Sequence, residues 1–249
     1  MKSALVTGGA RRIGAAIAAN LARNGFNVAI QYASSEDEAE LLASKLRAFG
    51  INASAFEADL LNADDCKDVL QKAIDAVGPI SLLVNNASMF EEDDAIKFDE
   101  KTFDNHVAIH LKAPSILAAE MHGQKELENG LIVNLIDQRV WNLTPKFYSY
   151  TLSKSALWTA TRTMAQSFAP KLRVNAIGPG PTLKNARQSP EDFQKQIDGL
   201  LLKRGPELSD FGDTIRYLYG MQSVTGQMIA LDGGQHLAWE TPDVSGIPE

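Results

Sequence analysis

Seven short apolar runs alternate with helix-like stretches along nearly the whole chain, and this alternation limits the possible folds more than any other feature of the sequence. The runs show little of the polar–apolar alternation of a half-exposed strand, so each is predicted to be buried on both faces. Strands that alternate with helices form a parallel sheet with helices on both sides. We therefore expect an α/β protein with a doubly wound parallel sheet of about seven strands: residues 4–8, 27–32, 54–59, 81–86, 131–136, 173–178 and 227–232.

The domain organisation is predicted to be simple. The sequence shows no linker, repeat or low-complexity segment, so residues 1–249 are expected to form one domain. The polar segment 181–205 lies between the last two predicted strands and interrupts the alternation. We interpret it as an inserted substrate loop that can act as a lid.

The composition argues against partners bound through charge or through lipid. The net charge of −7 gives no general attraction for nucleic acid or for an anionic membrane. No apolar run approaches the roughly 18 residues of a membrane helix. The chain runs directly into a predicted strand, without a signal peptide, and has one cysteine, Cys66. We expect a cytoplasmic protein that acts on a small molecule and binds neither nucleic acid nor membrane.

The first predicted strand leads into the segment TGGARRIG, residues 7–14. Gly8 and Gly9 allow a tight turn after Thr7, and Gly14 allows the following helix to pack close to the sheet. The free N–H groups at the start of that helix form a phosphate site. A glycine-rich turn in this place predicts a Rossmann-type dinucleotide site.

The end of the second predicted strand favours NADP(H) over NAD(H). NAD sites usually carry an acidic residue there to hold the ribose hydroxyls, whereas this chain reads QYASS over residues 31–35. Arg11 and Arg12 stand at a helix N-terminus, where the dipole disfavours cations by roughly 0.3–1 kcal/mol unless an anion lies between them. The acidic residues 36–38 argue against this reading, and the two arginines can alternatively point into water. The residues expected to bind the ribose end of the cofactor are Tyr32, Ser34 and Ser35.

The segment FYSYTLSK, residues 147–154, begins a helix that contains a candidate acid. At about 100° per residue, Tyr150 and Lys154 share a helix face, whereas Tyr148 and Lys154 do not. A nearby ammonium favours the phenolate and is expected to lower the pKa of Tyr150. A phenol tuned in this way can transfer a proton near neutral pH.

Four segments together resemble the short-chain dehydrogenase/reductase family: the turn at 7–14, NNA at 85–87, the Tyr150/Lys154 pair and GPG at 178–180. The resemblance runs from Leu5 to about Gly234 and implies NADP-dependent oxidoreductase activity. It implies that Tyr150 donates a proton and that Lys154 tunes Tyr150 and binds the nicotinamide ribose. The other cofactor-binding residues that it implies are Thr7, Gly8, Arg11, Arg12, Ile13, Gly14, Asp59, Leu60, Asn86, Ala87, Pro179 and Gly180.

Three positions depart from the general family pattern. Arg12 replaces a glycine of the turn, Asp137 replaces the catalytic serine expected thirteen residues before Tyr150, and His110 replaces a helix asparagine. With these departures the chain resembles pteridine reductases and dihydromonapterin reductases. The similarity implies that Phe90 stacks a pterin ring against the nicotinamide. The residues implied to bind substrate are Arg12, Ser88, Phe90, Asp137 and Tyr150.

The carboxyl group at position 137 suits the reduction of a C=N bond. Such a reduction delivers a proton to nitrogen, and a carboxyl beside Tyr150 can accept from an N–H or share its proton with the phenol. A carboxylate also raises the pKa of a neighbouring tyrosine, opposing Lys154 and keeping Tyr150 protonated. The alternative is a solvated acid at the end of a strand with no chemical role.

Two other functions remain open from the sequence. The substrate can instead be a carbonyl compound, such as a steroid, sugar or acyl carrier, or the chain can be an NADP-binding sensor without activity. The histidines show no spacing with cysteine or acidic residues that predicts a metal site. The acidic stretch 91–100 is predicted to be a solvated rim. Apolar residues on several faces of the helix after Tyr148, together with the segment 231–244, imply a homotetramer through the family resemblance.

Overall fold

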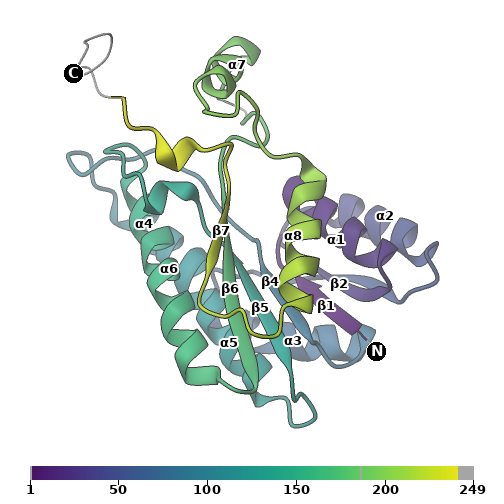
Figure 1. Cartoon of the computed structure of the whole chain (residues 1–249). Helices are drawn as coiled ribbons and strands as arrows, with labels where there is room; N and C mark the ends of the chain where they lie inside the picture. Colours follow the sequence, from purple (N-terminus) through teal and green to yellow (C-terminus); the bar gives the residue numbers. More distant parts are fainter. Residues whose placement is uncertain (1, 186, 241–249) are drawn as a thin grey trace.

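The computed structural model describes residues 2–185 and 187–240 (Figure 1). Residues 1, 186 and 241–249 of the predicted domain lie outside the described residues, including part of the predicted contact segment 231–244. None of the helices in the described part of the chain is long and apolar enough to cross a membrane.

Seven parallel strands form one sheet in the order β3-β2-β1-β4-β5-β6-β7. This arrangement confirms the predicted fold class, and the strand ends fall within two residues of the predicted ends. The central strands are buried along nearly their whole length, as their uninterrupted apolar runs predict. The strands are β1 (Lys2–Val6), β2 (Phe26–Tyr32), β3 (Ala53–Glu57), β4 (Leu82–Asn85), β5 (Gly130–Leu135), β6 (Leu172–Pro179) and β7 (Met228–Leu231).

Helices cover both faces of the sheet (Figure 1). Between the helices and the sheet lie two apolar cores. One core lies under α1 (Arg12–Arg23), α2 (Glu36–Arg47) and α8 (Leu208–Gly220). The other lies under α3 (Ala63–Val77), α5 (Ala113–Gly123) and α6 (Tyr148–Phe168). The remaining helices are α4 (Glu100–Val107), which contacts α6, and α7 (Pro190–Asp198), which lies within the predicted insertion between β6 and α8.

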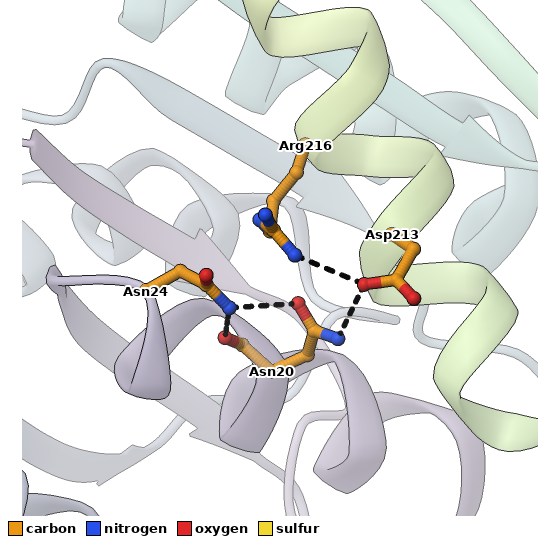
Figure 2. A network of polar contacts seen from close by, with 4 residues as sticks. All are labelled: Asn20, Asn24, Asp213 and Arg216. Carbon is orange, nitrogen blue, oxygen red and sulfur yellow. Dashed lines mark hydrogen bonds and ion pairs between the residues drawn. The ribbon is translucent and has the colours of Figure 1, made fainter.

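A polar network fixes α8 against α1 (Figure 2). The Asn20 side chain donates to Asp213 at 3.0 Å, and Arg216 donates to the same carboxylate oxygen at 3.0 Å. Gly212 allows this approach, because a Cβ there would lie 2.3 Å from Cγ of Asn20. The packing holds α1, and therefore the turn that precedes it, in a fixed position on the sheet.

The strand order reverses between β1 and β4. β1 pairs with β2 on one side and with β4 on the other, so the connections leave the sheet in opposite directions at this place. Open α/β sheets bind ligands outside the carboxyl ends of the strands at such a switch point. The functional site is therefore expected where the chain leaves β1 and β4.

The helix α6 buries one side against the sheet. Leu157, Thr161 and Ala165 are buried, whereas Trp158 and Met164 remain partly exposed. Thr161 also accepts from Asn134 of β5 at 2.8 Å, and Asn134 accepts from Asn85 of β4 at 2.8 Å. This buried chain of hydrogen bonds sets the depth of α6 on the sheet. The homotetramer stays a prediction.

Candidate active site

The turn after β1 is held by hydrogen bonds to the residues that follow β4. The Thr7 hydroxyl accepts from the backbone N–H of Asn86 at 3.0 Å and of Ala87 at 3.1 Å. In return, the Asn86 side chain donates to the carbonyls of Thr7 and Gly8 at 2.8 and 3.0 Å. The carboxyl ends of β1 and β4 are thereby joined into one rigid rim.

The glycines of this turn make room for close backbone contacts. Gly8 has a φ of +58° and lies so close to Ala87 that a Cβ on it would approach the Ala87 Cα to 2.9 Å. Arg12 occupies the family's third glycine position and keeps a left-handed φ of 53°, which non-glycine residues rarely adopt. The turn therefore retains a glycine-type conformation where the sequence has arginine.

Gly14→Ala is expected to lower the Tm of the protein. A Cβ at this position would lie 2.4 Å from the carbonyl oxygen of Gly8 and 2.6 Å from Nδ2 of Asn86, and the Gly8 backbone cannot swing aside. Overpacking of this kind costs about 1–3 kcal/mol. Gly123→Ala is the matched control, since a Cβ there meets no atom within 4 Å. Equal melting temperatures for the two variants would contradict the expectation.

A pocket of about 460 Å³ extends from this turn across the ends of the strands. It brings together most of the residues predicted to bind the cofactor, although it does not include Thr7, Tyr150, Lys154, Pro179 or Gly180 among its lining residues. The predicted residues that line it are Gly8, Arg11, Arg12, Ile13, Gly14, Tyr32, Ser34, Ser35, Asp59, Leu60, Asn86 and Ala87.

The two arginines of the turn point to different partners. Arg11 forms an exposed ion pair with Glu38 of α2 at 3.7 Å. Arg12 donates to the carbonyls of Leu183 and Lys184 in the inserted segment, at 3.4 and 3.3 Å. Their joint contact with a cofactor phosphate and the role of Arg12 in substrate binding stay predictions.

A second pocket of about 840 Å³ opens beside the first, and both are lined by Arg12, Ile13 and Ser88. Residues from the inserted segment form part of its wall, and the function of that segment as a substrate loop stays a prediction. Pro179 and Gly180 at the end of β6 line this pocket. The other predicted site residues in its wall are Phe90, Asp137 and Tyr150.

Tyr150 and Asp137 meet in the second pocket. The phenol donates to Oδ2 of Asp137 at 3.0 Å, while Oδ1 accepts from the backbone N–H of Arg139 at 2.8 Å. Burial raises the pKa of Tyr150 well above that of a free phenol, and the Asp137 carboxylate raises it further. Burial also raises the pKa of Asp137, against the opposing effect of Arg139. The pair therefore holds a proton tightly at the wall of the pocket.

Lys154 is buried below this pair, and the net lowering of the Tyr150 pKa expected from its ammonium group does not occur. Its Nζ lies 5.7 Å from the centre of the Tyr150 ring and donates to the carbonyl of Leu135 at 2.8 Å. Burial lowers the pKa of Lys154 to about 8, although Asp137 opposes the shift. The pKa of Tyr150 is raised rather than lowered because burial and the adjacent carboxylate dominate. The predicted effect of the carboxylate is thus confirmed.

Phe90 forms an aromatic wall next to Tyr150. Its ring stacks on Phe147 with centroids 4.1 Å apart and meets the Tyr150 ring edge-on at 4.7 Å. The Arg139 guanidinium lies 5.4 Å from the centroid of the Phe90 ring and 5.2 Å from that of the Phe147 ring, within the range of a cation–π contact. Stacking of a substrate on Phe90 stays a prediction.

Asp93 is an anchoring residue that the sequence did not reveal. The prediction of a solvated rim is wrong for it, because its carboxylate accepts from the backbone N–H and the hydroxyl of Ser149. Its carbonyl accepts from the N–H groups of Phe147 and Tyr148, at 2.9 and 3.3 Å. These contacts satisfy free donors at the start of α6, as a helix cap does. The first turn of α6, with Tyr150, is thereby fixed to the loop after β4.

The chain resembles known proteins over nearly its full length. A family model described as short chain dehydrogenase matches residues 2–195. The 3-oxoacyl-(acyl-carrier-protein) reductase FabG of Staphylococcus epidermidis is 30% identical over 242 residues, which cover 95% of this chain and 99% of that protein.

Two solved structures are more similar in sequence. FolM alternative dihydrofolate reductase 1 from Brucella canis, complexed with NADP, is 56% identical with a TM-score of 0.95; the match covers 98% of this chain and 97% of that one. The FolM structure from Brucella suis, also in complex with NADP, is 56% identical with a TM-score of 0.96, and 98% of each chain is covered.

Proposed function

The chain belongs to the short-chain dehydrogenase family, and from this premise we propose that it is an NADPH-dependent reductase that transfers a hydride to a pterin-type ring, converting a dihydropterin to a tetrahydropterin. The dihydrofolate reductase name and the bound NADP of the two Brucella structures support both parts of the proposal. Dihydrofolate contains a pterin ring, so the proposal names the chemical class that those relatives share.

The observation that carries the proposal is the 3.0 Å hydrogen bond between the Tyr150 phenol and Asp137. Reduction of a ring C=N bond delivers a proton to nitrogen, and a phenol whose pKa is raised keeps its proton until a base accepts it. A carbonyl substrate is better served by a hydroxyl that donates to the developing oxyanion. This chain has a carboxyl group at that position.

The residues of the first pocket fit a dinucleotide. The turn after β1 has space only for glycine at positions 8 and 14, which leaves backbone N–H groups at the start of α1 free to approach a pyrophosphate. Asp59 and Leu60 would flank the adenine, and Lys154 would hold the nicotinamide ribose. When bound, the nicotinamide supplies the hydride.

The side chains of the second pocket manage the proton. Tyr150 donates its hydroxyl proton to the ring nitrogen of the substrate. Asp137 accepts the hydrogen bond of the phenol before this transfer and shares the proton with which Tyr150 is reprotonated afterwards. Lys154 contributes a positive charge beneath the ring of Tyr150. Phe90 and the inserted segment cover the substrate and exclude water.

Ser34→Asp is expected to weaken the preference for NADPH over NADH by about 10-fold to 100-fold, through repulsion between the new carboxylate and the 2′-phosphate. Ser34 is exposed in the first pocket, just past the end of β2, so the new side chain needs no repacking. The ratio of kcat/KM values for the two cofactors measures the effect. Ser34→Asn, which has the same size without the charge, is the control. An unchanged ratio in the aspartate variant would place the 2′-phosphate elsewhere.

The proposed function is tested by NADPH oxidation with a substrate panel. Dihydrobiopterin, dihydromonapterin and dihydrofolate are expected to be reduced much faster than simple ketones or a 3-oxoacyl thioester. Turnover of the thioester alone would instead support the carbonyl reductase suggested by the FabG relative. Binding of NADPH without any turnover would support a sensor.

A further inference from the structure

His110 is a buried residue that contacts Ser88, which lines both pockets, and Tyr150, which lines the second. It lies on a π-helical turn, η1 (Ala108–Lys112), that joins α4 to α5, and its side chain is only 1% exposed. Its ring meets the Tyr150 ring edge-on, with centroids 5.3 Å apart. Both ring nitrogens have partners: Nδ1 lies 2.9 Å from the Ser153 hydroxyl, and Nε2 lies 2.8 Å from the Ser88 hydroxyl.

The neighbours of His110 determine which nitrogen holds the proton. The Ser153 hydroxyl donates its only hydrogen to the Tyr150 carbonyl at 2.8 Å, so its oxygen accepts from Nδ1–H. The backbone N–H of Met89 donates to Nε2 at 3.4 Å, so Nε2 accepts. These two contacts independently give the same neutral tautomer. Burial lowers the pKa of His110 well below its ordinary value, with help from Lys154 and His106, which keeps the ring neutral.

This tautomer fixes the direction of the Ser88 hydroxyl. Since Nε2 is an acceptor, Ser88 donates its hydrogen to it at 2.8 Å; its other neighbouring acceptor is the Met89 carbonyl at 3.2 Å. With either partner the hydrogen is donated to an acceptor of the protein itself. Ser88 is exposed and lines both pockets, so a ring bound there would meet a hydroxyl oxygen whose hydrogen is already donated within the protein.

We propose that His110 is a positioning residue that makes Ser88 a hydrogen-bond acceptor only, so that the site selects substrate rings with an amino N–H over rings with a carbonyl oxygen in its place. This inference rests on the proposed function and names the ring substituent that the site reads. A carbonyl opposite Ser88 would place two acceptors together, with no hydrogen between them, and leave both unpaired.

The selection for an amino group is tested by comparing the kcat/KM values for 7,8-dihydropterin and 7,8-dihydrolumazine. The second compound has an oxo group in place of the amino group. The native chain is expected to favour dihydropterin in kcat/KM by about 10-fold to 100-fold. His110→Asn and Ser88→Ala are expected to bring that ratio close to one, because the first frees the Ser88 hydroxyl to turn and the second removes it. A general disturbance around Tyr150 lowers both rates and leaves the ratio unchanged. The matched control is His122→Asn, at an exposed histidine of α5, which should keep the native ratio.

NMR of the imidazole nitrogens in ¹⁵N-labelled protein provides a readout that needs no turnover. His110 is expected to show a protonated Nδ1 and an unprotonated Nε2 across the neutral pH range. The opposite tautomer, or a native ratio retained in both His110→Asn and Ser88→Ala, would overturn the inference. If the native chain reduces no dihydropterin, the proposed function fails, and the NMR result still decides the direction of the Ser88 hydroxyl.

Discussion

Tyr150→Phe is expected to reduce kcat for dihydropterin by about 10²-fold to 10⁴-fold, the usual contribution of a positioned general acid. The substitution removes only the hydroxyl, so the edge-on contacts of the ring with Phe90 and His110 remain possible. NADPH affinity, measured by fluorescence titration, should change little by comparison. A drop in kcat at constant cofactor affinity would identify the phenol as the proton donor.

Tyr148→Phe is the matched control for this experiment. Tyr148 lies in the same first turn of α6 but outside the walls of the two pockets. Its variant should keep native activity. Comparable losses in the two variants would point to a disturbed helix start, and full activity in Tyr150→Phe would exclude the proposed proton transfer.

Asp137→Asn is expected to lower kcat/KM for dihydropterin by about 10²-fold or more, because an amide cannot share a proton with Tyr150.

The same substitution should raise the Tm at neutral pH. The folded-state pKa of Asp137 is raised by burial, so its stabilising contribution is present at low pH and is lost as the pH rises through that pKa. Above that pKa the native carboxylate is a buried charge, and asparagine removes it. Differential scanning calorimetry and steady-state rates measure the two effects.

The pH dependence gives the same prediction a second readout. Reduction consumes a proton. Because the pKa of Asp137 is raised, this carboxyl group becomes protonated at a higher pH than an ordinary carboxyl group does. The kcat/KM of the native chain should therefore rise as the pH falls through this titration, and the profile of Asp137→Asn should be flatter. Full turnover in both Asp137→Ser and Asp137→Ala would remove Asp137 from the mechanism.

The sheet is predictable from the sequence because its signal is local. A strand buried on both faces needs an apolar run, and each of the seven runs in the chain became a strand. The face shared by Tyr150 and Lys154 follows from helix geometry alone. The thirteen-residue spacing predicted that Asp137 lies near Tyr150, and the two side chains form a hydrogen bond. These inferences need only distances along the chain and, for Asp137, the family resemblance.

Other parts of the site depend on segments that meet only in the folded chain. Asp93 binds Ser149 across 56 residues, and no local pattern distinguishes it from the neighbouring acids. His110 forms hydrogen bonds with Ser88 and Ser153 from a π-helical turn, and no pattern in the sequence predicts that turn. The dominant effect of burial on the pKa of Tyr150 could not be predicted for a related reason, since burial is a property of the whole fold.

The position of Arg12 has a practical consequence for anyone who re-engineers this catalyst to run on a cheaper coenzyme. Arg12 lines both pockets, and its guanidinium donates to the carbonyls of Leu183 and Lys184 in the inserted segment, other residues of which line the second pocket. If the two pockets hold coenzyme and substrate as proposed, an exchange of Arg12 is expected to alter the binding of both. Ser34 lines the first pocket and not the second, so the proposal makes it a position where coenzyme choice can be adjusted separately.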